Sequence, residues 1–127
     1  MKKNVLNTAI GIFFIMLSLT ATAQNARHSD INIINFTVMM NQNKVKINWS
    51  TDKMGSANYF EVEKSNDGKN FKTVAYVLGA DPAKKDCDCY GCFDKISGSA
   101  EKSYYRLKHV DSSGLIEFSE IKMLALK

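Results

Sequence analysis

Residues 104–119 read YYRLKHVDSSGLIEFS, and this stretch decides the fold of the chain. Tyr105 and Leu107 alternate with charged residues, which is the period of a strand with one face in a core and the other in water. Asp111–Gly114 has the composition of a tight turn. The apolar residues after that turn predict a returning strand. Because a lone hairpin is at best marginally stable, the residues upstream must supply the rest of a sheet.

Short segments rich in apolar and β-branched residues, separated by turn residues, occur throughout the mature chain. Apart from the hairpin, the predicted strands are 31–40, 44–49, 59–63, 71–78 and 90–93. With 104–110 and 115–124 they make seven. No ten-residue stretch after residue 23 keeps a 3.6-residue apolar period, so the sequence predicts an all-β fold, a seven-stranded β-sandwich.

Two strands change phase. Ile31 and Ile33 share one parity, whereas the apolar residues that follow share the other. A second change occurs near Ser119 and Glu120. The first change predicts a β-bulge or a switch of the strand between sheets, and the second predicts a β-bulge. Trp49, the one tryptophan, lies on the apolar face of its strand and is predicted to anchor the core.

Residues 1–23 differ from the rest of the chain. Lys2 and Lys3 precede an apolar run, Ala9 to Leu19, and Ala21–Ala23 supplies a small-residue cleavage site. This pattern predicts a signal peptide over 1–23 and one domain over 24–127. The apolar run is short for a bilayer core of ~30 Å, so no membrane span is expected after cleavage. We expect an exported protein that is periplasmic, displayed on the outer surface, or secreted.

The charge of the chain argues against a nucleic-acid partner. The formal net charge is +4, and Lys and Arg are spread evenly rather than clustered. Nucleic-acid binding needs a basic patch or stripe. An ordinary solvated surface is therefore expected.

The sequence resembles fibronectin type III modules in three places. Lys46–Trp49 resembles the second strand, Tyr59–Glu63 the third, and Tyr105–Asp111 with Gly114 the sixth strand and its exit turn. The set is also similar to immunoglobulin-like sandwich modules of secreted Bacteroidetes surface proteins. That resemblance implies a structural, spacer or binding module and brings no catalytic residues. It also suggests that Tyr105 is a corner tyrosine whose hydroxyl bonds a nearby backbone group.

Glu61 and Glu63 share one strand face at a spacing of ~7 Å, which overlaps the carboxylate separation of inverting glycosidases. In the sandwich they are expected to lie across from Arg106 and Lys108 as cross-strand ion pairs. We prefer that interpretation. His28 and His109 are the two histidines available as bases; the first precedes the domain and the second lies near a strand end.

Cys87, Cys89 and Cys92 form the spacing C-x-C-x-x-C in a polar loop. Three thiolates suit Cu(I) or Zn²⁺, although no fourth ligand is evident. The preferred alternative for an exported chain is a Cys89–Cys92 disulfide closed by a turn at Tyr90–Gly91. Cys87 would then be free to link a second chain in a dimer.

The sequence therefore favours an exported, non-enzymatic binding or structural module at the cell envelope, without a cofactor. Its partner would be an envelope protein or a glycan. The alternative is a small metal-binding or thiol-redox protein that uses Cys87, Cys89 and Cys92. An enzyme acting on glycans through Glu61 and Glu63 is a third hypothesis.

The exported protein is expected to begin at Gln24, in part as its cyclised form. Intact mass spectrometry of the mature chain measures this directly. A mass that includes Met1 would show that the apolar run is retained as an anchor.

Overall fold

The computed structural model describes residues 31–53, 57–96 and 98–126, which form strands and loops. The strands in chain order are β1 (Ile33–Asn41), β2 (Lys44–Thr51), β3 (Ala57–Ser65), β4 (Lys72–Val77), β5 (Cys89–Lys95), β6 (Lys102–Asp111), β7 (Ile116–Phe118) and β8 (Lys122–Ala125). The predicted signal peptide lies outside the described residues. None of those residues forms a helix long and apolar enough to cross a bilayer.

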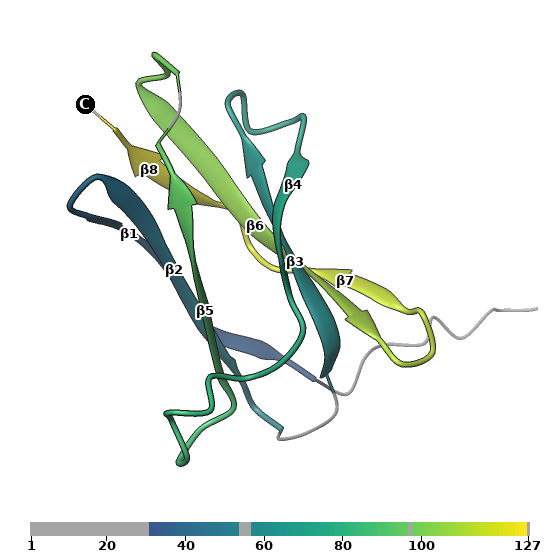
Figure 1. Cartoon of the computed structure of the whole chain (residues 1–127). Coiled ribbons are helices and arrows are strands. Elements are labelled where there is room, and N and C mark those ends of the chain that lie inside the picture. Colours follow the sequence, from purple (N-terminus) through teal and green to yellow (C-terminus); the bar gives the residue numbers. More distant parts are fainter. Residues whose placement is uncertain (1–30, 54–56, 97, 127) are drawn as a thin grey trace, which may run out of the picture.

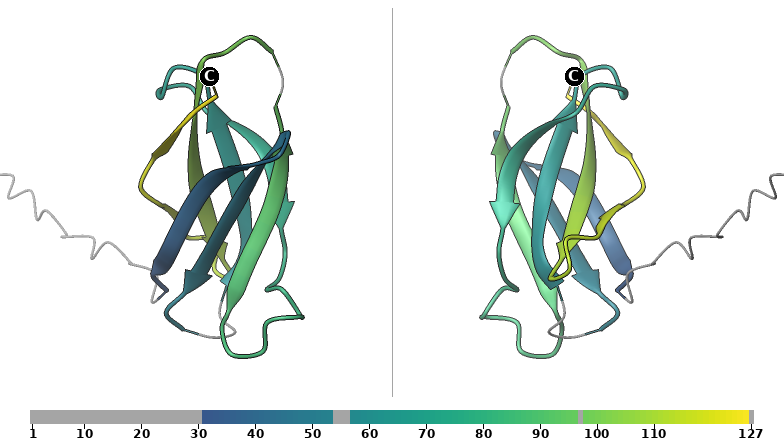
Figure 2. Two further views of the ribbon diagram at one scale, coloured as in Figure 1. Left: turned by 90° about the vertical axis from the view of Figure 1, so that its left-hand side faces the viewer. Right: turned by 90° about the vertical axis from the view of Figure 1, so that its right-hand side faces the viewer.

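The strands form two antiparallel sheets that pack face to face (Figure 1). One sheet has the order β1-β2-β5. The other has the order β4-β3-β6-β7, with β8 also paired to β6. The left view of Figure 2 looks onto the side of β1, β2 and β5, and the right view looks onto the side of β4, β3 and β7. The predicted β-sandwich is confirmed.

The predicted last strand, 115–124, is two short strands rather than one, so the sandwich has eight strands instead of seven. Ser119 causes the break. The Leu107 N–H donates to the Ser119 hydroxyl at 2.8 Å, and the Ser119 N–H donates to the Leu107 carbonyl at 2.9 Å. Because the Ser119 hydroxyl, not its carbonyl, accepts the hydrogen bond from Leu107, the regular pairing of β7 with β6 ends here. Pairing with β6 begins again at β8.

The predicted bulge in the first strand is confirmed. The pairing of β1 with β2 shifts register between Ile34 and Thr37. Asn35 adopts a positive φ of 55°, and its side-chain amide donates to the Ser50 hydroxyl at 3.0 Å. Asparagine tolerates this backbone region better than most residues, so it absorbs the extra residue. The bulge restores the inward direction of Phe36 after the phase change.

The turn between β6 and β7 is held by one carboxylate. Asp111 Oδ1 accepts hydrogen bonds from the Ser113 N–H at 2.8 Å and the Leu115 N–H at 2.9 Å. Gly114 has φ +85°, a conformation that glycine adopts without steric cost. Hydrogen bonds to the ionised carboxylate, that of the Ser113 hydroxyl first, hold the pKa of Asp111 below its usual value.

Trp49 lies at the centre of the core with 2% of its surface exposed. Its indole stacks on Tyr90 of the neighbouring strand, with ring centroids 5.7 Å apart. It also meets Phe60 of the other sheet edge-on at 5.3 Å. No acceptor for the indole N–H is found among the described residues, so ring packing holds this side chain. The buried cluster comprises Phe36, Val45, Ile47, Trp49, Phe60, Val62, Tyr90, Tyr105 and Leu107.

A carboxylate also joins the two sheets. Asp94 of β5 accepts a hydrogen bond from the Tyr105 hydroxyl at 2.8 Å and pairs with Lys64 at 3.0 Å. Tyr105 thus bonds a side chain, not the backbone group expected of a corner tyrosine. Desolvation, followed by its bond to Asp94, raises the pKa of Tyr105. This contact ties β5 to both central strands of the other sheet.

Replacing Trp49 with Ala is expected to lower the free energy of unfolding by ~3–5 kcal/mol, because it removes a fully packed large side chain. Urea unfolding followed by circular dichroism measures the loss. Phe93→Ala is the matched control, since Phe93 is an aromatic residue of the same sheet with 57% of its surface exposed. A loss below ~1 kcal/mol for Trp49→Ala, in the range of ordinary surface substitutions, would contradict the central role of the indole.

Candidate functional site

Two ion pairs lie side by side on the outer face of the larger sheet. Lys108 Nζ is 2.6 Å from a carboxylate oxygen of Glu61, and Arg106 Nε is 2.6 Å from one of Glu63. The register of β3 with β6 places each acid directly opposite its base. The predicted cross-strand ion pairs are therefore confirmed. The bond to Glu61 raises the pKa of Lys108.

Arg106 is held on three sides. Its guanidinium carbon lies 4.1 Å from the ring centroid of Phe71 and 4.2 Å from that of Phe118, in addition to the bond to Glu63. A guanidinium over an aromatic face is attracted by the ring quadrupole. The two rings come from distant segments, the loop before β4 and strand β7. The Arg106 side chain is therefore fixed in one position on the face.

Large apolar side chains surround these ion pairs and are open to solvent. Tyr76 of β4 has 65% of its surface exposed and Phe118 of β7 has 51%. Ile116 and Met123 are exposed to a similar extent. We call this surface, the outer side of β4, β3, β6 and β7 with its two ion pairs and exposed rim, the ion-pair face.

The sequence predicted the charged residues of the ion-pair face but not its exposed rim, which includes Tyr76 and Phe118. Tyr76 stands opposite Glu61, and Phe118 stands opposite Lys108. Both pairings follow from the registers of short edge strands. The signal available in the sequence was the aromatic residue in each of the two segments flanking the charged strands.

The arrangement does not favour catalysis by Glu61 and Glu63. Each carboxylate is engaged by a cation, and both residues are buried beneath their neighbours. A groove with a volume of about 600 Å³ lies between β1 and β7 and is lined by residues such as Phe36 and Phe118. Glu61 and Glu63 do not line it. The glutamate pair therefore offers neither a free base nor an open site for a sugar.

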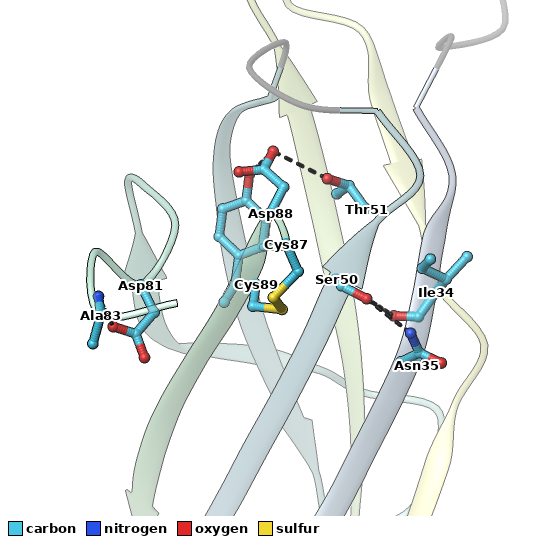
Figure 3. Close-up of a disulfide and its surroundings, with 10 residues drawn as sticks. Ile34, Asn35, Ser50, Thr51, Asp81, Ala83, Cys87, Asp88 and Cys89 are labelled. Carbon is cyan, nitrogen blue, oxygen red and sulfur yellow. Dashed lines mark hydrogen bonds between the residues drawn. A yellow bond between two sulfur atoms is a disulfide. The ribbon is translucent and has the colours of Figure 1, made fainter. Parts of the chain in front are cut away.

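The disulfide joins Cys87 to Cys89, with their Cα atoms 5.2 Å apart (Figure 3). The predicted Cys89–Cys92 bridge is wrong, and Cys87 is not free for a covalent dimer. The reason is that β5 begins at Cys89. Residues three apart in a strand point to opposite faces, whereas the prediction required a turn at Tyr90–Gly91. The loop is fastened to β2 by a hydrogen bond of 3.2 Å from the Thr51 hydroxyl to Asp88.

Cys92 carries the remaining thiol. It is partly buried and packs against the core cluster. Burial, with the charge of Asp94 nearby, raises the pKa of the thiol to about 11. Since the thiolate is the metal-binding and nucleophilic form, this residue is poorly suited to either role. Within the described residues no group of three or more ligating side chains has the arrangement of a metal site.

His109 belongs to the core rather than to a site. It has 1% of its surface exposed, and its ring lies 4.9 Å from that of Phe60. Burial lowers the pKa of the imidazole, because it disfavours the charged form. The other histidine considered as a base, His28, lies outside the described residues.

No family model matches this chain, and no curated protein matches it. Its fold resembles parts of solved structures. Pectate lyase Pel3 from Pectobacterium carotovorum aligns with a TM-score of 0.58 and 15% identity, over 75% of this chain and 27% of the lyase. A β-1,2-glucanase from Parabacteroides distasonis aligns with a TM-score of 0.55 and 19% identity, over 76% of this chain and 13% of the glucanase.

A DUF3823 family protein from Bacteroides ovatus aligns with a TM-score of 0.57 and 14% identity, over 76% of this chain and 54% of that protein. The described chain thus spans about a quarter of the lyase and about half of the Bacteroides protein. At these identities the likeness shows a shared β-sandwich fold and nothing finer.

Iodoacetamide is expected to label one thiol per denatured, unreduced chain, at Cys92, and to label the native chain slowly because that thiol is buried and protonated. Peptide mapping by mass spectrometry locates the label and the Cys87–Cys89 link. Cys92→Ala is the control and should take up no label. Label on Cys87, or on all three cysteines, would refute this pairing.

Proposed function

We propose that this protein is an exported, non-enzymatic binding module of fibronectin type III-like build that acts at the cell envelope. Its binding surface is the ion-pair face. The observation that carries the proposal is the exposed aromatic rim of this face, Tyr76 and Phe118 above all, around charges that already neutralise one another.

The composition of the ion-pair face supports a role in binding. Tyr, Phe, Met and Arg are enriched at the cores of protein interfaces, whereas Lys, Glu and Asp are depleted there. The rim and Arg106 follow this composition, and the paired Glu61, Glu63 and Lys108 do not. Here Arg106 is fixed between two rings, so little side-chain freedom remains to be lost when a partner covers it. A surface that is ordered before contact binds at a lower entropic cost.

The wider architecture supports a module. The strand orders β1-β2-β5 and β4-β3-β6-β7 suit the fibronectin type III resemblance of the sequence. The similar solved structures named for polysaccharide-degrading enzymes are matched over only 27% and 13% of their length. Such matches suit a domain that forms one part of larger proteins. The pattern of residues 1–23 supports export.

The metal or thiol-redox alternative has less support. It needed three neighbouring thiolates at Cys87, Cys89 and Cys92. The described structure engages two of them in a disulfide and partly buries the third. We therefore do not propose a cofactor.

Cell fractionation tests the proposal. The wild-type chain is expected in the envelope fraction, and Tyr76→Glu should reduce its retention there at least about tenfold, the loss typical of an interface aromatic residue. Phe93→Glu, a matched exposed aromatic residue on the other sheet, should leave retention unchanged. Equal retention of all three proteins would overturn the proposal, as would a wild-type chain that stays in the cytosol with residues 1–23 attached.

A further inference from the structure

One row of side chains across the ion-pair face is complementary in charge to the same row read in reverse. Register pairing sets Tyr76 beside Glu61, Glu61 beside Lys108, and Lys108 beside Phe118. The order across β4, β3, β6 and β7 is therefore aromatic, acid, base, aromatic. Two residues along the strands, Glu63 and Arg106 repeat the order of acid and base. The acids thus form a column on β3 and the bases a column on β6.

Such a row is complementary to its own copy. Consider a twofold axis that lies in the plane of contact, parallel to the strands and midway between β3 and β6. Rotation about this axis sets the β3 column of one chain over the β6 column of the other. Glu61 then faces the second copy's Lys108, and Tyr76 faces its Phe118. An isologous contact requires this kind of self-complementarity.

We infer that the ion-pair face binds a second copy of this chain, forming a twofold symmetric homodimer in which the two larger sheets pack face to face. The inference rests on the proposed function, because it names the partner of the same binding face. Sheets that pack in this way keep their strands nearly aligned, within about 30°. That geometry agrees with an axis parallel to the strands.

The charges also select this orientation over the other in-plane twofold. An axis perpendicular to the strands would set β3 over β3, with Glu61 against its own copy and Lys108 against its own copy. Like charges brought together across an interface are strongly unfavourable. The columns of acids and bases therefore favour the twofold axis parallel to the strands and disfavour the axis perpendicular to them.

The ion-pair face matches a second copy better than a charged ligand. Both acids are already paired with bases at 2.6 Å, so these four side chains leave no acid or base over to attract a charged ligand. The carboxylates are nearly covered before any contact. Little further desolvation is then needed on association, and desolvation is the main cost of burying charges. The exposed area that remains to be covered is mainly aromatic and aliphatic.

Analytical ultracentrifugation of the mature chain tests the inference, with non-reducing electrophoresis to exclude disulfide-linked species. The wild-type chain should sediment as a reversible dimer. Tyr76→Glu and Phe118→Lys should each raise the dimer dissociation constant at least about tenfold, as expected for an interface aromatic residue. Phe93→Glu should leave the constant unchanged.

Mixing the two variants makes the test specific to the predicted contact. In a mixed dimer the introduced acid of one chain faces the introduced base of the other, and the second contact keeps its native Tyr76 and Phe118. The equimolar mixture should therefore regain dimer that neither variant forms alone. Urea unfolding checks that each variant is folded; if Phe118→Lys is not, Tyr76→Glu against Phe93→Glu still decides whether this face carries the dimer.

A monomeric wild-type chain at concentrations up to about 1 mM, the weak end of specific association, would overturn the dimer. So would a Tyr76→Glu chain that dimerises like the wild type, or a mixture of folded variants that fails to regain dimer. If the chain is monomeric but its envelope retention still depends on Tyr76, the ion-pair face is still supported as the binding surface. Only the proposal that its partner is a second copy is then contradicted. If the chain dimerises but its envelope retention does not depend on Tyr76, the homodimer is supported and the proposed role of this face at the envelope is contradicted.

Discussion

The contact of Trp49 with Phe60 across the sandwich is the constraint on which the rest of the structure depends. Its ring centroids are 5.3 Å apart, and it joins the central strand of one sheet to a central strand of the other. Tyr90 stacks on the indole, and His109 lies against the Phe60 ring. Because side chains alternate along a strand, turning these positions inward turns their neighbours outward. The placement of Glu61 and Lys108 on the outer face follows from the packing of Phe60 and His109 beneath them.

The polar groups of the sandwich are satisfied at its margins rather than in its centre. Asp94 receives both the Tyr105 hydroxyl and Lys64 where the two sheets meet, and Asp111 receives the N–H groups of its turn. A buried polar group without a partner costs ~1–3 kcal/mol, so these carboxylates allow apolar strands to end without that cost. In the interior, aromatic and aliphatic packing surrounds a few polar atoms for which the described residues supply no partner, among them the Trp49 indole N–H and both ring nitrogens of His109.

The sequence predicted the sandwich because its decisive signals are local. The two-residue alternation and the phase change at Asn35 lie within single strands, and both appear in the structure. The second phase change, near Ser119, marks the point where the predicted last strand divides into β7 and β8 rather than a bulge. The cysteine pairing failed because it depended on whether Tyr90 and Gly91 turn or extend, and pairing of β5 with β2 settles that. The row from Tyr76 to Phe118 was equally inaccessible. It requires the registers of four strands, including a shift between Val62 and Glu63 that no local pattern reveals.

The interruption at Ser119 also shortens the ladder at one edge of the larger sheet. Exposed sheet edges readily pair with other chains, and short or bulged edge strands oppose this. At one edge β7 and β8 span only three and four residues on either side of the Ser119 interruption, and β1 is bulged at Asn35. Neither offers a long regular ladder to a second chain. The ion-pair face, by contrast, is centred on β3 and β6, of nine and ten residues, with Arg106 held between Phe71 and Phe118. Two of the sheet edges are therefore shortened or bulged, and the proposed association through the ion-pair face requires no edge pairing.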